Sequence, residues 1–554
     1  MAPLSRAGRA AAAWLAAMAA GAFAARWPAA GAALGTLGGG WALARRRLPL
    51  GMAIAGFTAV AAAAALPWAA LARDPFHALP ASADWPVAAV ALAFLGTGAL
   101  VWTAFPALDV AAAPAVPAPP ALRRALHLEL GALALLLPVG IAGTQVALAL
   151  IAATLAWAVF RGARLRGTGA LGGPVAALLA AALVSIALAA RPTPPWTITA
   201  LRALVAFFVL GWALGAADLD EGRALRLVAL WASASAAVSA LAFVQHWSGF
   251  DLLAALHLRA AVRVAAPESP GHLAGIGTFA SRLTFAHATL VPLAALLGLQ
   301  LAGAARRPLW LGALALELAG LWSTFARAAW IAAAALAGVA AILALSTRER
   351  RRVLLGLGAA AAAVALLFAL APGARTWGLA ALDPSANRDR LFLWARAAQI
   401  ALDHPLHGVG FGSYHLILGP YYDRLDAAFP MRTWAHDMPL SLLCETGPFG
   451  LFAYAWLIVA GLSLAGSAKA PQPIARGLAL GAALATLAFA IVATFHDSLY
   501  DGQVAYNLFF ALALGSWATG NTALLRARGY EPEILRRPSP LPRETRIGSR
   551  DNPR

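Results

Sequence analysis

The chain has 554 residues, of which 61% are hydrophobic and only 12% are charged, and its formal net charge is +18. A soluble domain carries about twice that charged fraction. The polar residues also cluster between long apolar runs, so the composition excludes a soluble globular protein. Only helices and closed β-barrels satisfy all their backbone hydrogen bonds in lipid. The apolar runs lack the alternating polarity of barrel strands, which leaves helices. We therefore predict an all-α polytopic membrane protein.

The positive charge does not indicate a nucleic-acid partner. The arginines sit at the ends of apolar runs and in the C-terminal tail, where the positive-inside rule places them in membrane proteins. A single cysteine, Cys444, excludes an intrachain disulfide and a thiolate metal cluster. No P-loop, zinc-protease or dinucleotide-binding motif occurs in a supporting context, so we expect neither a metal nor another cofactor.

Residues 1–120 are expected to form an N-terminal extension of about four transmembrane helices. Arg6 and Arg9 precede an apolar run that ends near Ala25. An uncleaved helix is favoured over a cleaved signal peptide, because a second apolar run follows almost at once. The proline-rich segment 111–126 then marks the boundary with the next domain.

Residues 121–525 are expected to form a core of twelve spans, each needing about 20 apolar residues. The spans are expected near 127–143, 144–160, 174–190, 197–217, 224–246, 283–303, 308–323, 327–345, 353–371, 438–466, 474–495 and 503–520. The basic clusters between them alternate with other loops, and together with the arginine-rich tail 526–554 they all fall on one side. The positive-inside rule makes that side cytoplasmic. The tail itself is predicted to be disordered.

One polar stretch, residues 372–437, interrupts the apolar runs on the opposite side of the membrane. It is long, aromatic and rich in titratable groups, which makes it the candidate active site. On the same side, Arg282 and Arg327 each open an apolar helix. The N-terminal end of a helix already favours an anion, and a guanidinium adds to that preference. Each arginine could instead be an interfacial residue whose charge reaches back to water.

Three motifs follow one another in the core. The segment from Ser323 to Trp330 opens a helix, and Arg390-Leu391-Phe392-Leu393-Trp394 leads to His404-Pro405-Leu406-His407-Gly408-Val409-Gly410. His436-Asp437 is followed, after nine residues, by Gly447-Pro448-Phe449-Gly450. In this order the motifs resemble the signature of the O-antigen ligase family of bacterial envelope enzymes. The resemblance covers residues 127–520 and implies twelve spans with one large periplasmic loop. This chain departs from the family pattern in having Asp437 where asparagine is commoner, a wider gap between Ser323 and Arg327, and the N-terminal extension.

The resemblance implies transfer of a glycan from undecaprenyl diphosphate to an acceptor hydroxyl at the periplasmic face of the bacterial inner membrane. The acceptor in the ligases is a sugar of the lipid A core, which places the reaction in lipopolysaccharide biosynthesis. Arg327 and Arg390, with Arg282 as a third candidate, suit the binding of the diphosphate. His436 suits the role of general base towards the acceptor hydroxyl. The diphosphate is already a good leaving group, so a metal-independent reaction is expected.

Other interpretations remain open at this point. An O-antigen polymerase or an O-linked protein oligosaccharyltransferase would use the same donor with another acceptor. A lipid-linked glycan flippase would need internal repeats and charges deep within spans, and Arg202 is nearly alone as such a charge. His436 could merely accompany Asp437 as a helix cap, and Gly447 and Gly450 suit close packing. His496, Asp497 and Asp501 either line the same cavity or are ordinary loop residues.

Overall fold

The structure is a computed structural model. It describes residues 118–163, 165, 168–189, 194–258, 261–266, 272–304, 308–344, 388–421, 434–469 and 472–527. Nearly all of these residues are helical, and eight of the described helices are long and apolar enough to cross a membrane. The prediction of an all-α polytopic membrane protein is confirmed. The N-terminal extension, the ninth expected span at 353–371 and the tail beyond residue 527 lie outside the described residues.

The helices occur where the apolar runs predicted them. Their bounds are α5 Pro120–Leu136, α6 Ile141–Phe160, α7 Gly172–Ala189, α8 Pro195–Ala216, α9 Glu221–Ser248, α10 Leu252–Ala255, α11 Arg282–Leu301, α12 Pro308–Ser323, α13 Arg327–Ala344, α16 Arg388–Asp403, α17 Tyr414–Ile417, α18 Met438–Ser463, α19 Pro473–Ala493 and α20 Gly502–Ala527. The prediction for the first span, 127–143, was wrong by several residues. Helix α5 begins at Pro120, where a proline suits the first turn, and it ends ahead of Pro138, which the predicted range crossed.

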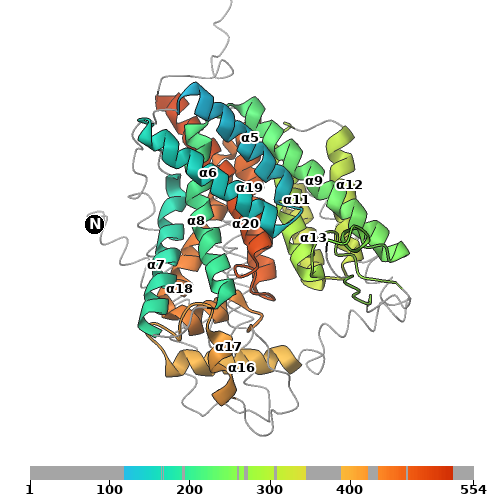
Figure 1. The fold of residues 1–554 in the computed structure, drawn as a ribbon, viewed down its shortest axis with the longest axis vertical. Helices are drawn as coiled ribbons and strands as arrows, with labels where there is room; N and C mark the ends of the chain where they lie inside the picture. Colours follow the sequence, from blue (N-terminus) through green and yellow to red (C-terminus); the bar gives the residue numbers. More distant parts are fainter. Residues whose placement is uncertain are drawn as a thin grey trace, which may run out of the picture.

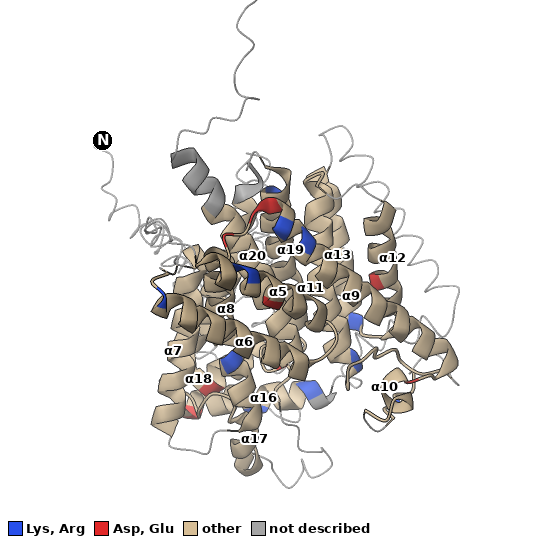
Figure 2. Ribbon diagram, turned by 45° about the horizontal axis from the view of Figure 1, so that its top comes forward, with Lys and Arg blue, Asp and Glu red and all other residues tan. Residues whose placement is uncertain are grey.

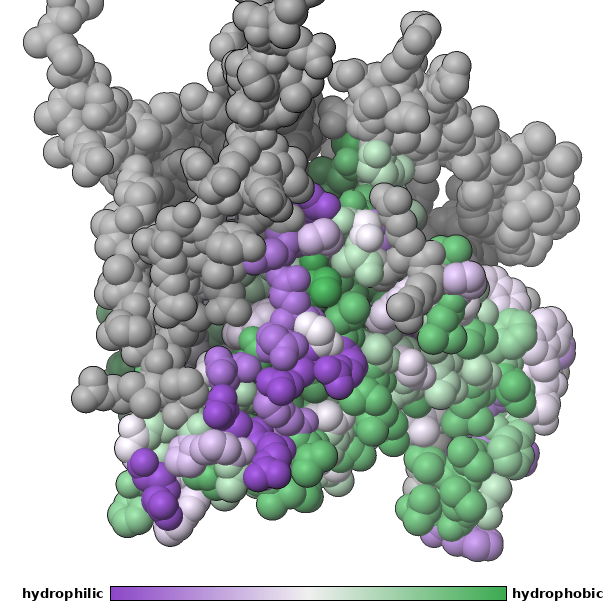
Figure 3. Space-filling model, turned by 90° about the horizontal axis from the view of Figure 1, so that it is seen from above, coloured by the Kyte–Doolittle hydropathy of each residue, from purple (hydrophilic) through white to green (hydrophobic). Residues whose placement is uncertain are grey.

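Successive long helices run in opposite directions, so the bundle has two ends (Figure 1). Helices α11, α13, α18 and α20 begin at one end, and α16 lies across it with α17 beside it. We call this the α16 end. At the opposite end α5 begins and α20 finishes, and Arg123 forms an ion pair with Asp218 at 3.0 Å. Figure 3 looks down on this opposite end and shows a hydrophilic patch bordered by hydrophobic side chains.

Helices α11 and α19 form the centre of the bundle. In each of them 78% of the span is buried inside the molecule, against 22% of the α13 span. The two central helices touch through glycine, because a Cβ on Gly298 would lie 2.2 Å from the backbone nitrogen of Gly481. The side chains of α11 at the α16 end therefore stand on a closely packed helix, and such a rigid element suits the positioning of a functional site.

Charged residues are sparse along the described helices (Figure 2). The expectation that Arg202 is nearly the only charge within a span was incomplete. Arg202 of α8 is exposed, but Glu317 of α12 and Glu445 of α18 are fully buried. Sequence polarity alone did not reveal them, because each carboxylate stands within a run of apolar residues. Glu445 turns out to organise the α16 end.

Candidate functional site

The start of α18 places His436. Asp437 caps the helix, since its side chain accepts a hydrogen bond from the Leu440 N–H at 2.9 Å, as predicted. His436 itself has φ +57°, a left-handed conformation that is rare for a residue with a side chain. Its backbone N–H donates to Asp497 Oδ2 at 2.7 Å, and the other oxygen of Asp497 accepts from the Ser441 hydroxyl. The strained backbone of His436 is thus held by a buried carboxylate from the turn between α19 and α20.

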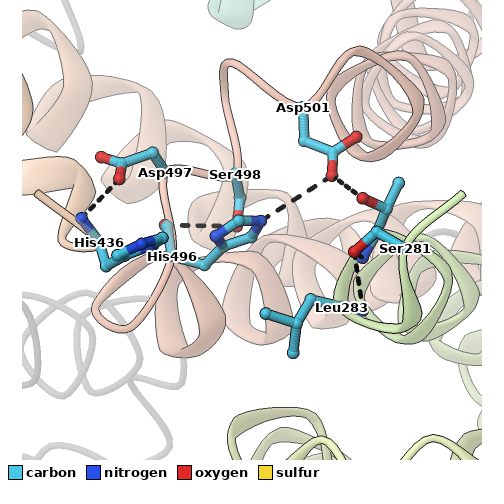
Figure 4. A network of polar contacts seen from close by, with 8 residues as sticks. Ser281, Leu283, His436, His496, Asp497, Ser498 and Asp501 are labelled. Atoms are coloured by element: carbon cyan, nitrogen blue, oxygen red, sulfur yellow. Dashed lines mark hydrogen bonds and ion pairs between the residues drawn. The ribbon is translucent and has the colours of Figure 1, made fainter. Parts of the chain in front are cut away.

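Three imidazoles meet at this turn. The ring centroid of His496 lies 5.9 Å from that of His436 and 5.1 Å from that of His287 on α11. His496 Nε2 lies 3.9 Å from Asp501 Oδ2, and Asp501 accepts a hydrogen bond from the Thr284 hydroxyl at 2.5 Å. Figure 4 shows His496 between His436 and Asp501, with one ring nitrogen turned to the carboxylate. Residues from α11, the 494–501 turn and the start of α18 therefore form one polar cluster.

Both arginines predicted to open helices do so. Helix α11 begins at Arg282, after the Ser281 side chain caps it, and α13 begins at Arg327. Arg282 reaches across to the turn between α12 and α13, where its NH1 donates to the carbonyls of Thr324 and Phe325 at 3.0 Å each. These carbonyls come directly before the segment that carries Arg327. Arg282 therefore fixes the turn that positions Arg327, which is a structural task not foreseen from the sequence.

Arg390 lies on α16, the helix that crosses the end of the bundle. Burial lowers the pKa of Arg390 below its usual range, and the positive charge of Arg327 lowers it further, so the two guanidinium groups lie near each other. An arginine nevertheless stays protonated at neutral pH. Among the described residues no carboxylate forms an ion pair with Arg390. Two neighbouring cations, one of them largely shielded from water, are electrostatically suited to an anion.

The glycine motifs hold α16 against α18. Helix α18 is broken at Gly447, which has φ +68° and ψ −168°, and Pro448 has no N–H to continue the helical hydrogen bonds. The carbonyl of Cys444 instead accepts from the Val409 N–H, and that of Glu445 accepts from the Gly410 N–H, both at 3.0 Å. The glycine motifs at 404–410 and 447–450, which are remote in sequence, therefore meet at these hydrogen bonds, and we call this contact the joint. Gly447 was expected to allow close packing, and the partner is the loop carbonyl of Leu406 rather than a helix.

The side chain of Glu445 completes this joint. One carboxylate oxygen accepts from the Tyr414 N–H at 3.0 Å, and the other accepts from the Tyr500 hydroxyl. Tyr414 in turn donates its hydroxyl to the carbonyl of Leu393 on α16 at 2.9 Å. The Tyr500 ring also stacks on Trp434, with centroids 4.7 Å apart. Glu445 therefore connects α16, α17 and the 494–501 turn, and its contacts help fix the position of Arg390 relative to the histidines.

The structure brings Arg282, Arg327, Arg390 and His436 to the same end of the bundle. It also places His496, Asp497 and Asp501 beside His436 rather than in a separate loop. His287 was not among the predicted site residues, although an ionisable residue inside an apolar span is a signal of function. The ring of His415 packs against that of Trp196, with centroids 4.4 Å apart. Among the described residues no group of three His, Cys, Asp or Glu is arranged to hold a metal ion.

Comparison with known proteins identifies this region. Residues 312–455 match the family described as O-antigen ligase. The matched segment runs from α12 into α18 and includes Arg327, Arg390 and His436, whereas Arg282 and the 494–501 turn lie outside it. No curated protein matches the chain. The match confirms the resemblance inferred from the three motifs: residues 312–455 are similar to the O-antigen ligase family, and this supports a glycan-transfer role in synthesis of the O-antigen or lipopolysaccharide type.

Proposed function

We propose that the chain transfers a glycan from undecaprenyl diphosphate to a hydroxyl of the lipid A core, at the periplasmic face of the bacterial inner membrane. The arrangement at the α16 end supports this reaction. It pairs two guanidinium groups, Arg327 and Arg390, with an imidazole group around His436. A group transfer from a lipid diphosphate needs both, because one binds the leaving anion and the other removes the acceptor proton.

The reaction has one bond made and one broken. The acceptor oxygen bonds to the anomeric carbon as His436 takes its proton. The bond between that carbon and the phosphoryl oxygen breaks, and its electron pair leaves with the diphosphate. Arg327 and Arg390 bind the charge that develops there, each through two parallel donors. Arg282 acts mainly through Arg327, by holding the turn ahead of it.

The observation that carries the proposal is the neighbourhood of Arg390. Its guanidinium is largely shielded from water and next to another cation, without an ion pair to a described carboxylate. That environment is unfavourable for an arginine alone and becomes favourable when an anion binds. Helix α16 and the hydrogen bonds that join it through Tyr414 to Glu445 hold Arg390 in place despite the repulsion from Arg327. The anion implied by the resemblance to the O-antigen ligases is the diphosphate headgroup of a lipid-linked donor.

The test is a transfer assay with the purified chain reconstituted in sealed proteoliposomes. The donor is a glycan on undecaprenyl diphosphate, and the acceptors are lipid A core, the same lipid-linked glycan, and a serine-containing peptide. We expect glycan on the lipid A core and release of undecaprenyl diphosphate. Product on the second or third acceptor would instead identify a polymerase or a protein oligosaccharyltransferase. Movement of the donor across the membrane without transfer would contradict the enzymatic proposal.

The matched variants are Arg390→Gln and Arg396→Gln. Both remove one positive charge from α16, and Arg396 is also buried, with its NH1 donating to Gln399 at 2.9 Å. Arg390 interacts electrostatically with Arg327, whereas the guanidinium of Arg396 lies over the ring of Phe392, 5.0 Å from its centroid. We expect donor binding and transfer to fall in Arg390→Gln and to stay near the parental level in Arg396→Gln. Equal loss in both variants would indicate a general effect of charge or of α16 stability.

A further inference from the structure

His287 has no evident structural purpose. It lies in α11 with only 2% of its surface exposed, and both ring nitrogens are buried without a hydrogen-bond partner among the described residues. Burying polar atoms without partners costs stability. In native structures such atoms are rare and usually have a function or a partner that arrives from outside the chain.

Two polar neighbours of His287 in the described part of the chain belong to the candidate site. Its ring centroid is 5.1 Å from that of His496, and it interacts electrostatically with the guanidinium of Arg390. Thr284 stands one turn earlier on the same face of α11 and donates to Asp501, the carboxylate beside His496. This face of α11 therefore lines the polar cluster, and His287 is more deeply buried in it than Thr284.

His287 interacts with both halves of the site. It interacts electrostatically with Arg390, which in turn interacts with Arg327. Its ring also neighbours that of His496, whose ring centroid lies 5.9 Å from that of His436. A donor with its diphosphate at the cations and its acceptor at His436 has its reacting bond between them.

We propose that His287 contacts the donor at the bond that breaks, donating its ring N–H to the phosphoryl oxygen that leaves with the electron pair. The inference rests on the proposed function, which assigns the diphosphate to Arg390 and the acceptor to His436. A neutral imidazole has one N–H to donate. The hydrogen bond strengthens as charge develops on the oxygen, so it accelerates the chemical step more than it aids donor binding.

The test compares His287→Leu, His287→Gln and Thr289→Val. Leucine removes the unpartnered nitrogens and fills the space, so the melting temperature should stay the same or rise. The kcat of transfer should fall about 10- to 100-fold, with little change in the KM for donor. Glutamine keeps an N–H donor and should recover part of kcat. Thr289 is a buried residue of the same helix, bonded to the Phe285 carbonyl at 2.9 Å and turned about 200° from His287, so its variant should keep the parental kcat.

Each outcome decides the matter. Parental kcat in His287→Leu overturns the inference while leaving glycan transfer intact. A fall in both melting temperature and kcat that glutamine does not relieve assigns His287 to the fold and also overturns it. Absence of transfer by the parental chain defeats the proposed function instead, and this result is visible before any variant is measured.

Discussion

The joint between the two glycine motifs leads us to predict that the variant Gly447→Ala loses both stability and transfer activity. A Cβ at this position would lie 2.2 Å from the carbonyl oxygen of Leu406, which is part of the backbone and cannot rotate away. The residue also has φ +68°, which alanine adopts only at a cost of about 1–3 kcal/mol. Relaxation into a regular helix is disfavoured as well, because Pro448 follows and restricts the preceding residue.

The expected cost of Gly447→Ala can be worked from these contacts. If the loop moves away, the hydrogen bonds from Val409 and Gly410 to α18 are lost, at about 1 kcal/mol each. With the backbone strain, the total is about 3–5 kcal/mol, or several degrees of melting temperature. Because the loop carries α16 and Arg390, transfer should also fall about a hundredfold.

Differential scanning fluorimetry and the transfer assay check this prediction. The matched control is Gly338→Ala in α13, where a Cβ would meet nothing within 4 Å. That variant should be neutral or stabilising by up to about 1 kcal/mol, since alanine is the better helix former. If both glycine variants behave alike, the joint does not hold α16 and the reasoning fails.

Three further predictions concern residues around the site. Arg282→Ala should lower transfer at least about tenfold, because it removes the NH1 donor that binds both carbonyls ahead of Arg327; unchanged transfer with wild-type stability would contradict this. Tyr500→Phe should cost about 1–3 kcal/mol in thermal unfolding, since it leaves an oxygen of the buried Glu445 without its donor; an unchanged melting temperature would refute it. Burial raises the pKa of Asp497, so the stability that its protonation contributes is present at low pH and is lost as the pH rises through the raised pKa. The melting temperature should therefore fall as the pH rises above about 4, and Asp497→Asn should flatten that fall; an equal slope in both proteins would be evidence against it.

Much of the fold follows directly from local sequence. Apolar runs of spanning length predict the helices, because lipid leaves few alternatives to a helical backbone. The helix starts at Arg282 and Arg327 and the cap at Asp437 were predictable for a similar reason, since each depends on residues within one turn. The first span shows the limit of this reasoning: hydrophobicity extends past Pro138, but the helix does not.

The site was only partly predictable, because its contacts join segments that are remote in sequence. Nothing near His436 indicates that Asp497, 61 residues away, binds its N–H. The spacing of Gly447 and Pro448 does not reveal that Val409 takes the place of the missing helical donor. His287 was overlooked because a single histidine in an apolar run has no local partner to draw attention to it. Such groups are found once packing brings them beside Arg390 and His496.

The most direct test of the central claim is the rate at which His436→Ala transfers a glycan from undecaprenyl diphosphate in the purified system. A general base contributes about 10²–10⁴-fold, and the diphosphate is assigned to arginines rather than to this imidazole. We therefore expect transfer to fall by at least about a hundredfold while the variant still binds the lipid donor. Transfer at the parental rate, with donor binding unchanged, would contradict the account.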